Sequence, residues 1–180
     1  MGKQILQLAF FLLVTTTTQA QFNTTLLGQY QYSAQRGECS DIWGYVDGVG
    51  NEYAIVGNET GTSIVDVTIP SSPVEVFYSA GEETIWRDMK VWGTTVYITN
   101  ESGSGLKIID LSNLPGAITG ANVSQYTGST YPFATAHNLF IDEFGRAFIV
   151  GADNGVGGAI ILDVATDPLN PIELGRYNDY

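Results

Sequence analysis

The sequence of 180 residues predicts an all-β fold, a β-propeller of four-stranded antiparallel blades, and three observations lead to this prediction. Short runs rich in Val, Ile, Tyr and Thr recur along the chain, each bounded by Gly, Pro, Asn or Asp, which is the pattern of strands and turns. Helical periodicity is absent. The runs come in groups of four with a period of about 44–51 residues, which is typical of propeller blades.

Runs that share a place in the repeat define each blade. The third run is β-branched and ends in Asp, and its copies are TSIVDVT (62–68), LKIIDLS (106–112) and AIILDVA (159–165). The second run carries an aromatic residue, and its copies are EYAIVGN (52–58), TVYITNE (95–101) and RAFIVGA (146–152). The first run has the copies DIWGYVD (41–47), RDMKVWG (87–93) and AHNLFID (136–142). The repeat therefore predicts three blades, at about 41–80, 86–127 and 136–180.

One more outer strand is predicted at 26–32, because LGQYQY (27–32) resembles LGRYNDY (174–180). Propellers commonly close by pairing an N-terminal strand with a last blade that lacks one, and three blades are fewer than the four to eight that form a ring. An unclosed ring would leave strand edges exposed. The simplest expectation is that the chain is the front part of a longer protein with an anchor or sorting segment beyond residue 180. Self-association into a closed ring is the alternative.

The N-terminus predicts export from the cell. A basic start at Lys3, an apolar run from Ile5 to Val14 and small residues before Gln21 match a secretory signal peptide at 1–20. The apolar run is about half the ~20 residues that a membrane-spanning helix needs, and no other segment of the sequence is apolar enough. We therefore expect a secreted domain at 21–180, associated with the cell surface.

Charge and cysteine content exclude several partner classes. The chain has 19 Asp and Glu against 7 Lys and Arg, which argues against nucleic acid and anionic membranes as partners. Cys39 is the single cysteine, so no intrachain disulfide stabilises the fold. One histidine and one cysteine are too few for a zinc site, and no metal site or cofactor is predicted.

Given these motifs, the chain resembles the bacterial extracellular proteins built on the LVIVD repeat, through the three runs that end in Asp. More narrowly, it resembles the choice-of-anchor B proteins through DIWGYVD (41–47), EYAIVG (52–57), TIWRDMKVW (84–92) and TAHNLFIDE (135–143). The resemblance implies a propeller body joined to a C-terminal anchoring segment. It implies no agreed enzymatic activity.

The first strands of the blades carry the candidate site. When the blades are aligned on their second strands, Ile42, Arg87 and His137 share one position, and Trp43, Asp88 and Asn138 share the next. The first strand of a propeller blade is innermost, so polar and aromatic residues far apart in sequence would converge at the channel mouth, where ligands bind. The predicted site consists of Asp41, Trp43, Trp86, Arg87, Asp88, His137 and Asn138.

Alternatively, the same residues have a structural role and bind no ligand. Arg87 with an aspartate could form an ion pair between blades, and Trp43 and Trp86 could fill the gap between them. The repeated aspartates Asp66, Asp110 and Asp163 precede turns, so we expect them to accept hydrogen bonds from turn amides rather than to bind metal. The loop 152–158 lacks the residue order of a calcium loop, and calcium at this loop is only a minor alternative.

The sequence therefore predicts a secreted, surface-associated binding or scaffold module whose ligand is a glycan or an extracellular protein. A propeller hydrolase or lyase that uses His137, Arg87 and an aspartate at the channel is one alternative, and a structural surface-layer component is another. No G-x-S-x-G motif is present, and no catalytic residue is assigned.

Overall fold

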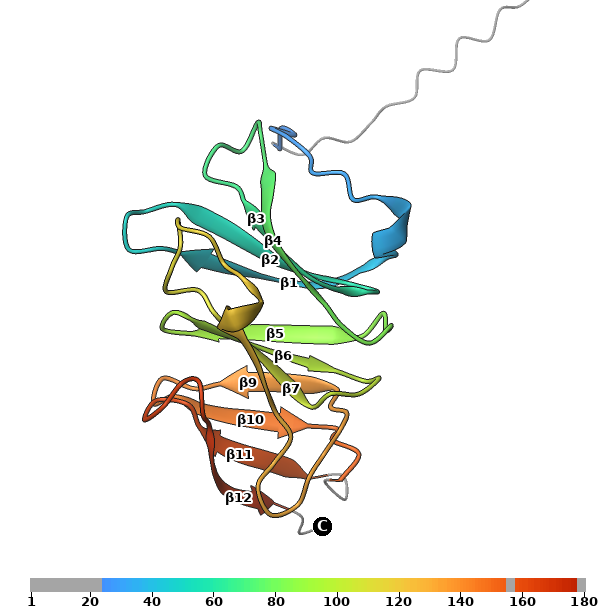
Figure 1. The fold of residues 1–180 in the computed structure, drawn as a ribbon, viewed down its shortest axis with the longest axis vertical. Coiled ribbons are helices and arrows are strands. Elements are labelled where there is room, and N and C mark those ends of the chain that lie inside the picture. Colours follow the sequence, from blue (N-terminus) through green and yellow to red (C-terminus); the bar gives the residue numbers. More distant parts are fainter. Residues whose placement is uncertain (1–23, 155–157, 178–180) are drawn as a thin grey trace, which may run out of the picture.

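The computed structural model describes residues 24–154 and 158–177, and in these residues the all-β prediction is confirmed. Twelve strands form three four-stranded antiparallel sheets, consistent with propeller blades, which follow one another along the long axis of the molecule (Figure 1). The predicted signal peptide at 1–20 lies outside the described residues. No helix in the described ranges is long and apolar enough to cross a membrane.

Each blade is one contiguous stretch of sequence, with its strands paired in chain order. Blade 1 consists of β1 (Cys39–Val46), β2 (Glu52–Asn58), β3 (Gly61–Asp66) and β4 (Val74–Ala80). Blade 2 consists of β5 (Arg87–Trp92), β6 (Thr95–Asn100), β7 (Leu106–Asp110) and β8 (Val123–Tyr126). Blade 3 consists of β9 (Asn138–Ile141), β10 (Arg146–Val150), β11 (Ala159–Asp163) and β12 (Ile172–Tyr177). Short 3-10 turns lie at Ala34–Arg36 and Gly120–Asn122.

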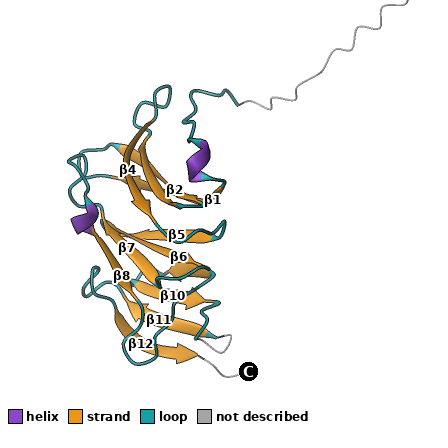
Figure 2. Ribbon diagram, turned by 45° about the vertical axis from the view of Figure 1, so that its right-hand side comes forward, coloured by secondary structure: helices purple, strands orange, loops and turns teal. Residues whose placement is uncertain are grey.

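The blades stack face to face, as Figure 2 shows. One apolar core joins blades 1 and 2, and its larger members are Tyr53, Ile55, Ile64, Met89, Ile98 and Ile109. A second core joins blades 2 and 3, and its larger members are Tyr97, Ile108, Leu139, Ile149, Ile160 and Leu162. Because blade 2 has a neighbour on both faces, every residue of β6 is buried, whereas β10 buries alternate residues.

The first strands are the innermost ones: β1 contacts β5, and β5 contacts β9. The N-terminal ends of these three strands therefore lie close together, and the candidate site is located there.

The register that the sequence predicted for blade 1 is wrong by two residues. The repeated aspartates pair with Tyr53 in blade 1, Thr95 in blade 2 and Arg146 in blade 3, so Ile55 takes the place of Tyr97 and Phe148. The hairpin between β2 and β3 is shorter than the one between β6 and β7, which shifts an alignment made on the aromatic residues. Blades 2 and 3 keep the predicted register.

The outer strand predicted at 26–32 is not formed. Residues 26–32 are not part of any strand, and none of the three sheets includes them. The segment from Leu27 to Tyr32 lies instead along a hollow that Val56, Val65 and Pro70 also line. It covers the outer part of blade 1.

Candidate ligand pocket at the inner strands

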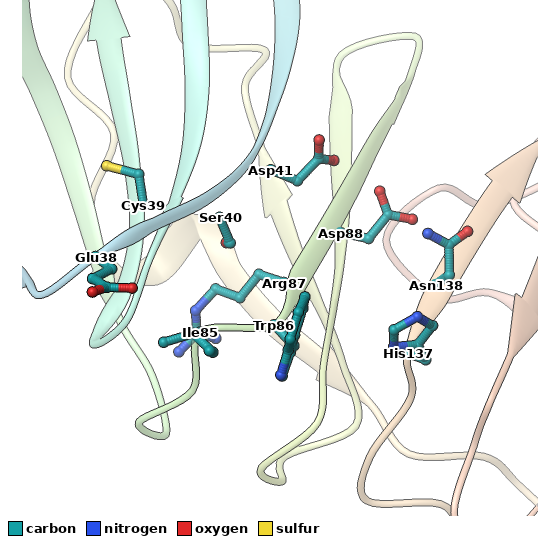
Figure 3. Close-up of a pocket in the computed structure, with 10 residues that line it drawn as sticks. All are labelled: Glu38, Cys39, Ser40, Asp41, Ile85, Trp86, Arg87, Asp88, His137 and Asn138. Atoms are coloured by element: carbon teal, nitrogen blue, oxygen red, sulfur yellow. The ribbon is translucent and has the colours of Figure 1, made fainter.

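A cavity of about 560 Å³ lies where β1, β5 and β9 begin (Figure 3). Three blades supply its lining, which consists of Glu38, Cys39, Ser40, Asp41, Ile85, Trp86, Arg87, Asp88, His137 and Asn138. Six of the seven residues predicted from the sequence are among them. The structure thus brings together residues that lie about 100 positions apart in the chain.

Trp43 is the predicted residue that does not line this cavity. The corrected register and an irregularity between Cys39 and Ile42 place Asp41, not Trp43, beside Asp88. Trp43 lies further along β1, where the Lys90 ammonium sits 4.5 Å from the centre of its ring. This cation–π contact joins blades 1 and 2.

Trp86 and His137 form an exposed side of the pocket, and Glu101 lies next to it, paired with His137. Trp86 is 54 % exposed, and the His137 side chain is 58 % exposed. Their ring centres lie 6.4 Å apart, and His137 Nδ1 pairs with a carboxylate oxygen of Glu101. Figure 3 shows Trp86 between Arg87 and His137. Neither ring belongs to either apolar core, so both are available to a ligand.

Arg87 has a structural role. It is 4 % exposed, and its Nε donates to the Asn58 carbonyl at 2.8 Å, while Nη2 donates to the carbonyls of Glu59 and Glu82. These bonds tie the β2–β3 hairpin to the start of blade 2. Burial lowers the pKa of Arg87 below its usual value. Because its donors are largely used by backbone, Arg87 shapes the pocket wall.

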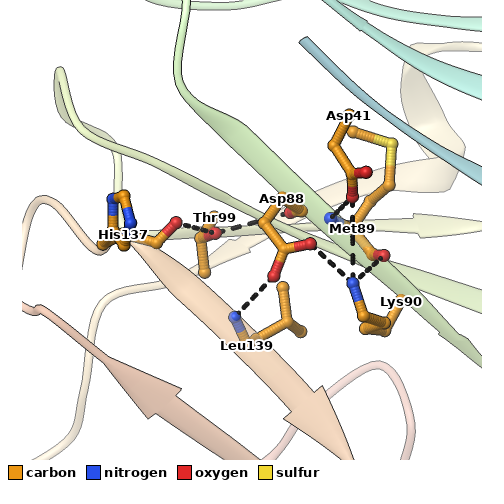
Figure 4. A network of polar contacts seen from close by, with 7 residues as sticks. All are labelled: Asp41, Asp88, Met89, Lys90, Thr99, His137 and Leu139. Carbon is orange, nitrogen blue, oxygen red and sulfur yellow. Dashed lines mark hydrogen bonds and ion pairs between the residues drawn. The ribbon is translucent and has the colours of Figure 1, made fainter.

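Asp88 and Asp41 link each blade to the next (Figure 4). Asp88 Oδ2 accepts from the Leu139 amide of blade 3 at 2.7 Å, and Asp41 Oδ2 accepts from the Met89 amide of blade 2 at 3.4 Å. Lys90 Nζ donates to Asp88 Oδ1 at 2.5 Å and lies 3.8 Å from Asp41 Oδ2. We call these carboxylate-to-amide contacts between blades the interblade latches.

The two carboxyls of the latches have opposite pKa shifts. Burial raises the pKa of Asp88, against the lowering effect of its bonds from Leu139 and Lys90. Burial also acts to raise the pKa of Asp41, but its hydrogen bonds with Asp88 and with backbone amides outweigh it, and the pKa falls below the usual value. Asp88 is therefore the first of the pair to take up a proton as the pH falls.

The turn aspartates behave as the sequence predicted. Asp66, Asp110 and Asp163 each accept a hydrogen bond from a backbone amide two residues later, at 2.8–2.9 Å. In the 152–158 loop, Asp153 accepts from the amides of Ala134 and Thr135. Within the part of the chain that the structure describes, no three His, Cys, Asp or Glu side chains are grouped to hold a metal ion.

Sequence reasoning missed three charged residues around the site. Glu101 follows β6 and meets His137 from the neighbouring blade. Lys90 supports the interblade latches, and Lys107 lies 5 % exposed between blades 1 and 2 with bonds to Ser79 and Ala80. A lysine within an apolar run is a signal that could have identified Lys107 in LKII (106–109), since a buried charge needs internal partners, whereas Lys90 lies on a strand that also holds Arg87 and Asp88. No feature of the sequence around Glu101 indicated that it would meet His137.

Fold and site together define a class of protein: an all-β repeat protein of propeller-type blades with a pocket at the inner strands. Within that class, residues 36–79 match the family model of the LVIVD repeat. The match covers blade 1 almost from end to end, so one repeat corresponds to one blade. A search of the curated proteins finds no match to the chain.

Proposed function

We propose that the chain is a secreted, surface-associated LVIVD-type module that binds a glycan in the pocket at the inner strands. The observation that carries the proposal is the half-exposed ring of Trp86 inside a cavity built by three blades. A large aromatic side chain left open beside polar groups is a usual feature of ligand sites.

The chemistry of the pocket suits a sugar. The faces of Trp86 and His137 offer surfaces on which the apolar face of a sugar ring stacks, and the exposed amide of Asn138 supplies polar groups for its hydroxyls. The volume of about 560 Å³ is within the range of small-molecule sites. An extracellular protein is the second occupant, and aromatic residues favour that binding mode as well.

Two finer parts of the proposal rest on sequence. The motifs at 41–47, 52–57, 84–92 and 135–143 support membership of the choice-of-anchor B group. The pattern of residues 1–20 supports export. A hydrolase or lyase has weaker support, because Asp88 is 6 % exposed and both its oxygens accept hydrogen bonds. A surface-layer component without a ligand is the remaining alternative.

Replacement of Trp86 tests the proposal. The full chain is applied to an array of immobilised oligosaccharides, and the affinity of the best binder is then measured by calorimetry. We expect Trp86→Ala and His137→Ala each to weaken binding at least about tenfold, because loss of a hot-spot contact costs about 2 kcal/mol or more and about 1.4 kcal/mol is already tenfold. The unfolding midpoint stays unchanged, since both side chains are exposed.

Phe144→Ala is the matched control, because Phe144 is 65 % exposed in a turn remote from the pocket. Its affinity stays that of the parent chain. If no oligosaccharide binds, or if Trp86→Ala binds as well as the parent, the glycan assignment is wrong.

A further inference from the structure

The exposed charges around the pocket are acidic. Glu38 and Asp41 belong to its lining, and Glu101 lies beside its His137. The side chains of Asp41 and Glu101 are 40 % and 37 % exposed, and Glu38 is exposed as well. Aspartate and glutamate side chains carry a negative charge at neutral pH. A ligand that enters the pocket therefore meets carboxylates that it can reach.

The cations near the pocket do not offset this charge towards a ligand. Arg87 is almost fully buried, and its bonds go to backbone carbonyls. Lys90 lies 2.5 Å from an oxygen of Asp88 and 3.8 Å from one of Asp41, so two carboxylates share its single charge. Among the described residues that line the cavity, no lysine or arginine is exposed.

His137 adds a hydrogen-bond acceptor to these carboxylates. Its Nδ1 pairs with the carboxylate of Glu101, which only accepts, so Nδ1 carries the hydrogen. In a neutral imidazole the other nitrogen, Nε2, is then an acceptor. No residue of the described ranges donates to Nε2. The exposed polar atoms of His137 and Glu101 therefore call for a ligand that donates hydrogen bonds.

The half-exposed ring of Trp86 favours the same kind of ligand. The face of an indole attracts a cation, and Trp is the best of the aromatic side chains in this respect. The inner strands already contain one such contact, since the Lys90 ammonium sits 4.5 Å from the centre of the Trp43 ring. Figure 3 shows Trp86 between the arginine and His137, on the side of the pocket where Glu101 lies.

We propose that the glycan of this pocket is cationic and carries free amino groups, as an oligosaccharide of glucosamine does. Its sugar ring stacks on Trp86, and its ammonium groups donate to Glu101, Asp41 and His137 Nε2. The inference rests on the proposed glycan site and adds the class of sugar. Hydrogen bonds between an ammonium and a carboxylate are among the strong ones, and the same carboxylates repel a uronic acid or a sulfated sugar.

Two matched ligands test the charge. The tetrasaccharides of glucosamine and of N-acetylglucosamine have the same rings, but the nitrogen is a charged amine in the first and a neutral amide in the second. Calorimetry with the full chain near neutral pH is expected to show at least about tenfold tighter binding of the glucosamine form. A tetrasaccharide of uronic acid is expected not to bind.

Glu101→Gln tests the residue. The amide oxygen of Gln still accepts from His137, but the negative charge is gone. The variant is expected to bind the glucosamine tetrasaccharide about three- to tenfold more weakly and the acetylated one within about twofold of the parent. Glu143→Gln is the matched control, because it removes the same charge at an exposed glutamate in the turn after β9, remote from the pocket. Its affinities stay those of the parent.

The outcomes separate this inference from the glycan site itself. Equal or tighter binding of the acetylated tetrasaccharide overturns the cationic class and leaves the glycan site in place. An equal loss in Glu143→Gln and Glu101→Gln also overturns it, since the attraction would then come from the overall charge of −12. Tighter binding of a tetralysine peptide means that the cationic ligand is not a sugar. If neither tetrasaccharide binds, or if Trp86→Ala binds both as the parent does, the proposed glycan site is wrong as well.

Discussion

Lys107 shows how a single residue can set the pH dependence of stability. Its ammonium donates to Ser79 Oγ at 3.1 Å and to the Ala80 carbonyl at 2.6 Å, and the residue is 5 % exposed between blades 1 and 2. Burial, assisted by the positive charge of Arg87, lowers the pKa of Lys107 to about 8. Folding therefore costs this lysine free energy whenever it is protonated.

The sign of the pH effect follows from this shift. The unfolded chain keeps the lysine protonated up to its ordinary pKa of 10.5, whereas the folded chain releases the proton from about pH 8 upward. The unfolding free energy is expected to rise by about 2 kcal/mol between pH 7.5 and 9.5. Urea unfolding at a series of pH values measures it. Above pH 10 the trend reverses, because burial raises the pKa of Tyr53 to about 12 and raises that of Tyr97 as well.

Lys107→Met separates this effect from other titrations. The methionine fills a similar volume without a charge, so the rise between pH 7.5 and 9.5 is expected to disappear. If the variant keeps the slope of the parent, Lys107 is not its source.

At the scale of elements, the interblade latches at β1 and β5 are among the polar contacts that hold one blade on the next. Removal of the Asp88 carboxylate leaves the Leu139 amide and the Lys90 ammonium without their partner inside the blade 2–blade 3 contact. Asp88→Ala is therefore expected to lower the unfolding free energy by about 2–4 kcal/mol. Chemical unfolding in urea measures the change.

Asn138→Ala is the matched comparison for the latch, because it removes the equivalent side chain of blade 3, which is exposed and bonds to no other side chain or backbone group of the described residues. Its cost is expected to stay below about 0.5 kcal/mol. Equal costs at Asp88 and Asn138 would show that the bond to the next blade contributes nothing.

The positions of the strands could be predicted from the sequence more fully than the register in which the strands pair. Strand positions follow from local alternation and turn residues, so blade limits at 39–80, 87–126 and 138–177 lie close to the expected ones. The register of blade 1 depends on the short hairpin after Asn58 and on the irregularity near Cys39, and aromatic spacing does not encode either feature. The alignment consequently placed Trp43 where Asp41 lies.

The location of the site was predictable from the sequence, but the roles of its individual residues were less so. Inner-strand position alone brought together six of the seven candidates. The role of Arg87 was not predictable, since its acceptors are backbone carbonyls of Asn58, Glu59 and Glu82, and a carbonyl has no side-chain signature. The meeting of Glu101 with His137 depends on how two blades stack, which is a long-range property.

At the scale of the whole molecule, the chain is a linear stack in which the substantial contacts between described strands lie within a blade or between neighbouring blades. In such a stack each blade gains stability from its own sheet and from each interface it makes. Blade 2 has two interfaces, and blades 1 and 3 have one each. The buried strands β6 and β7 lie in the middle, whereas β4 and β12 are outer strands of the end blades with several exposed residues.

Hydrogen exchange of the chain is therefore expected to be slowest in β6 and β7 and fastest in β4 and β12, because local opening starts where the fewest contacts are lost. Peptide-resolved mass spectrometry measures it. Equal protection across all three blades would instead mean that the stack opens as a single unit, with blades 1 and 3 as stable as blade 2.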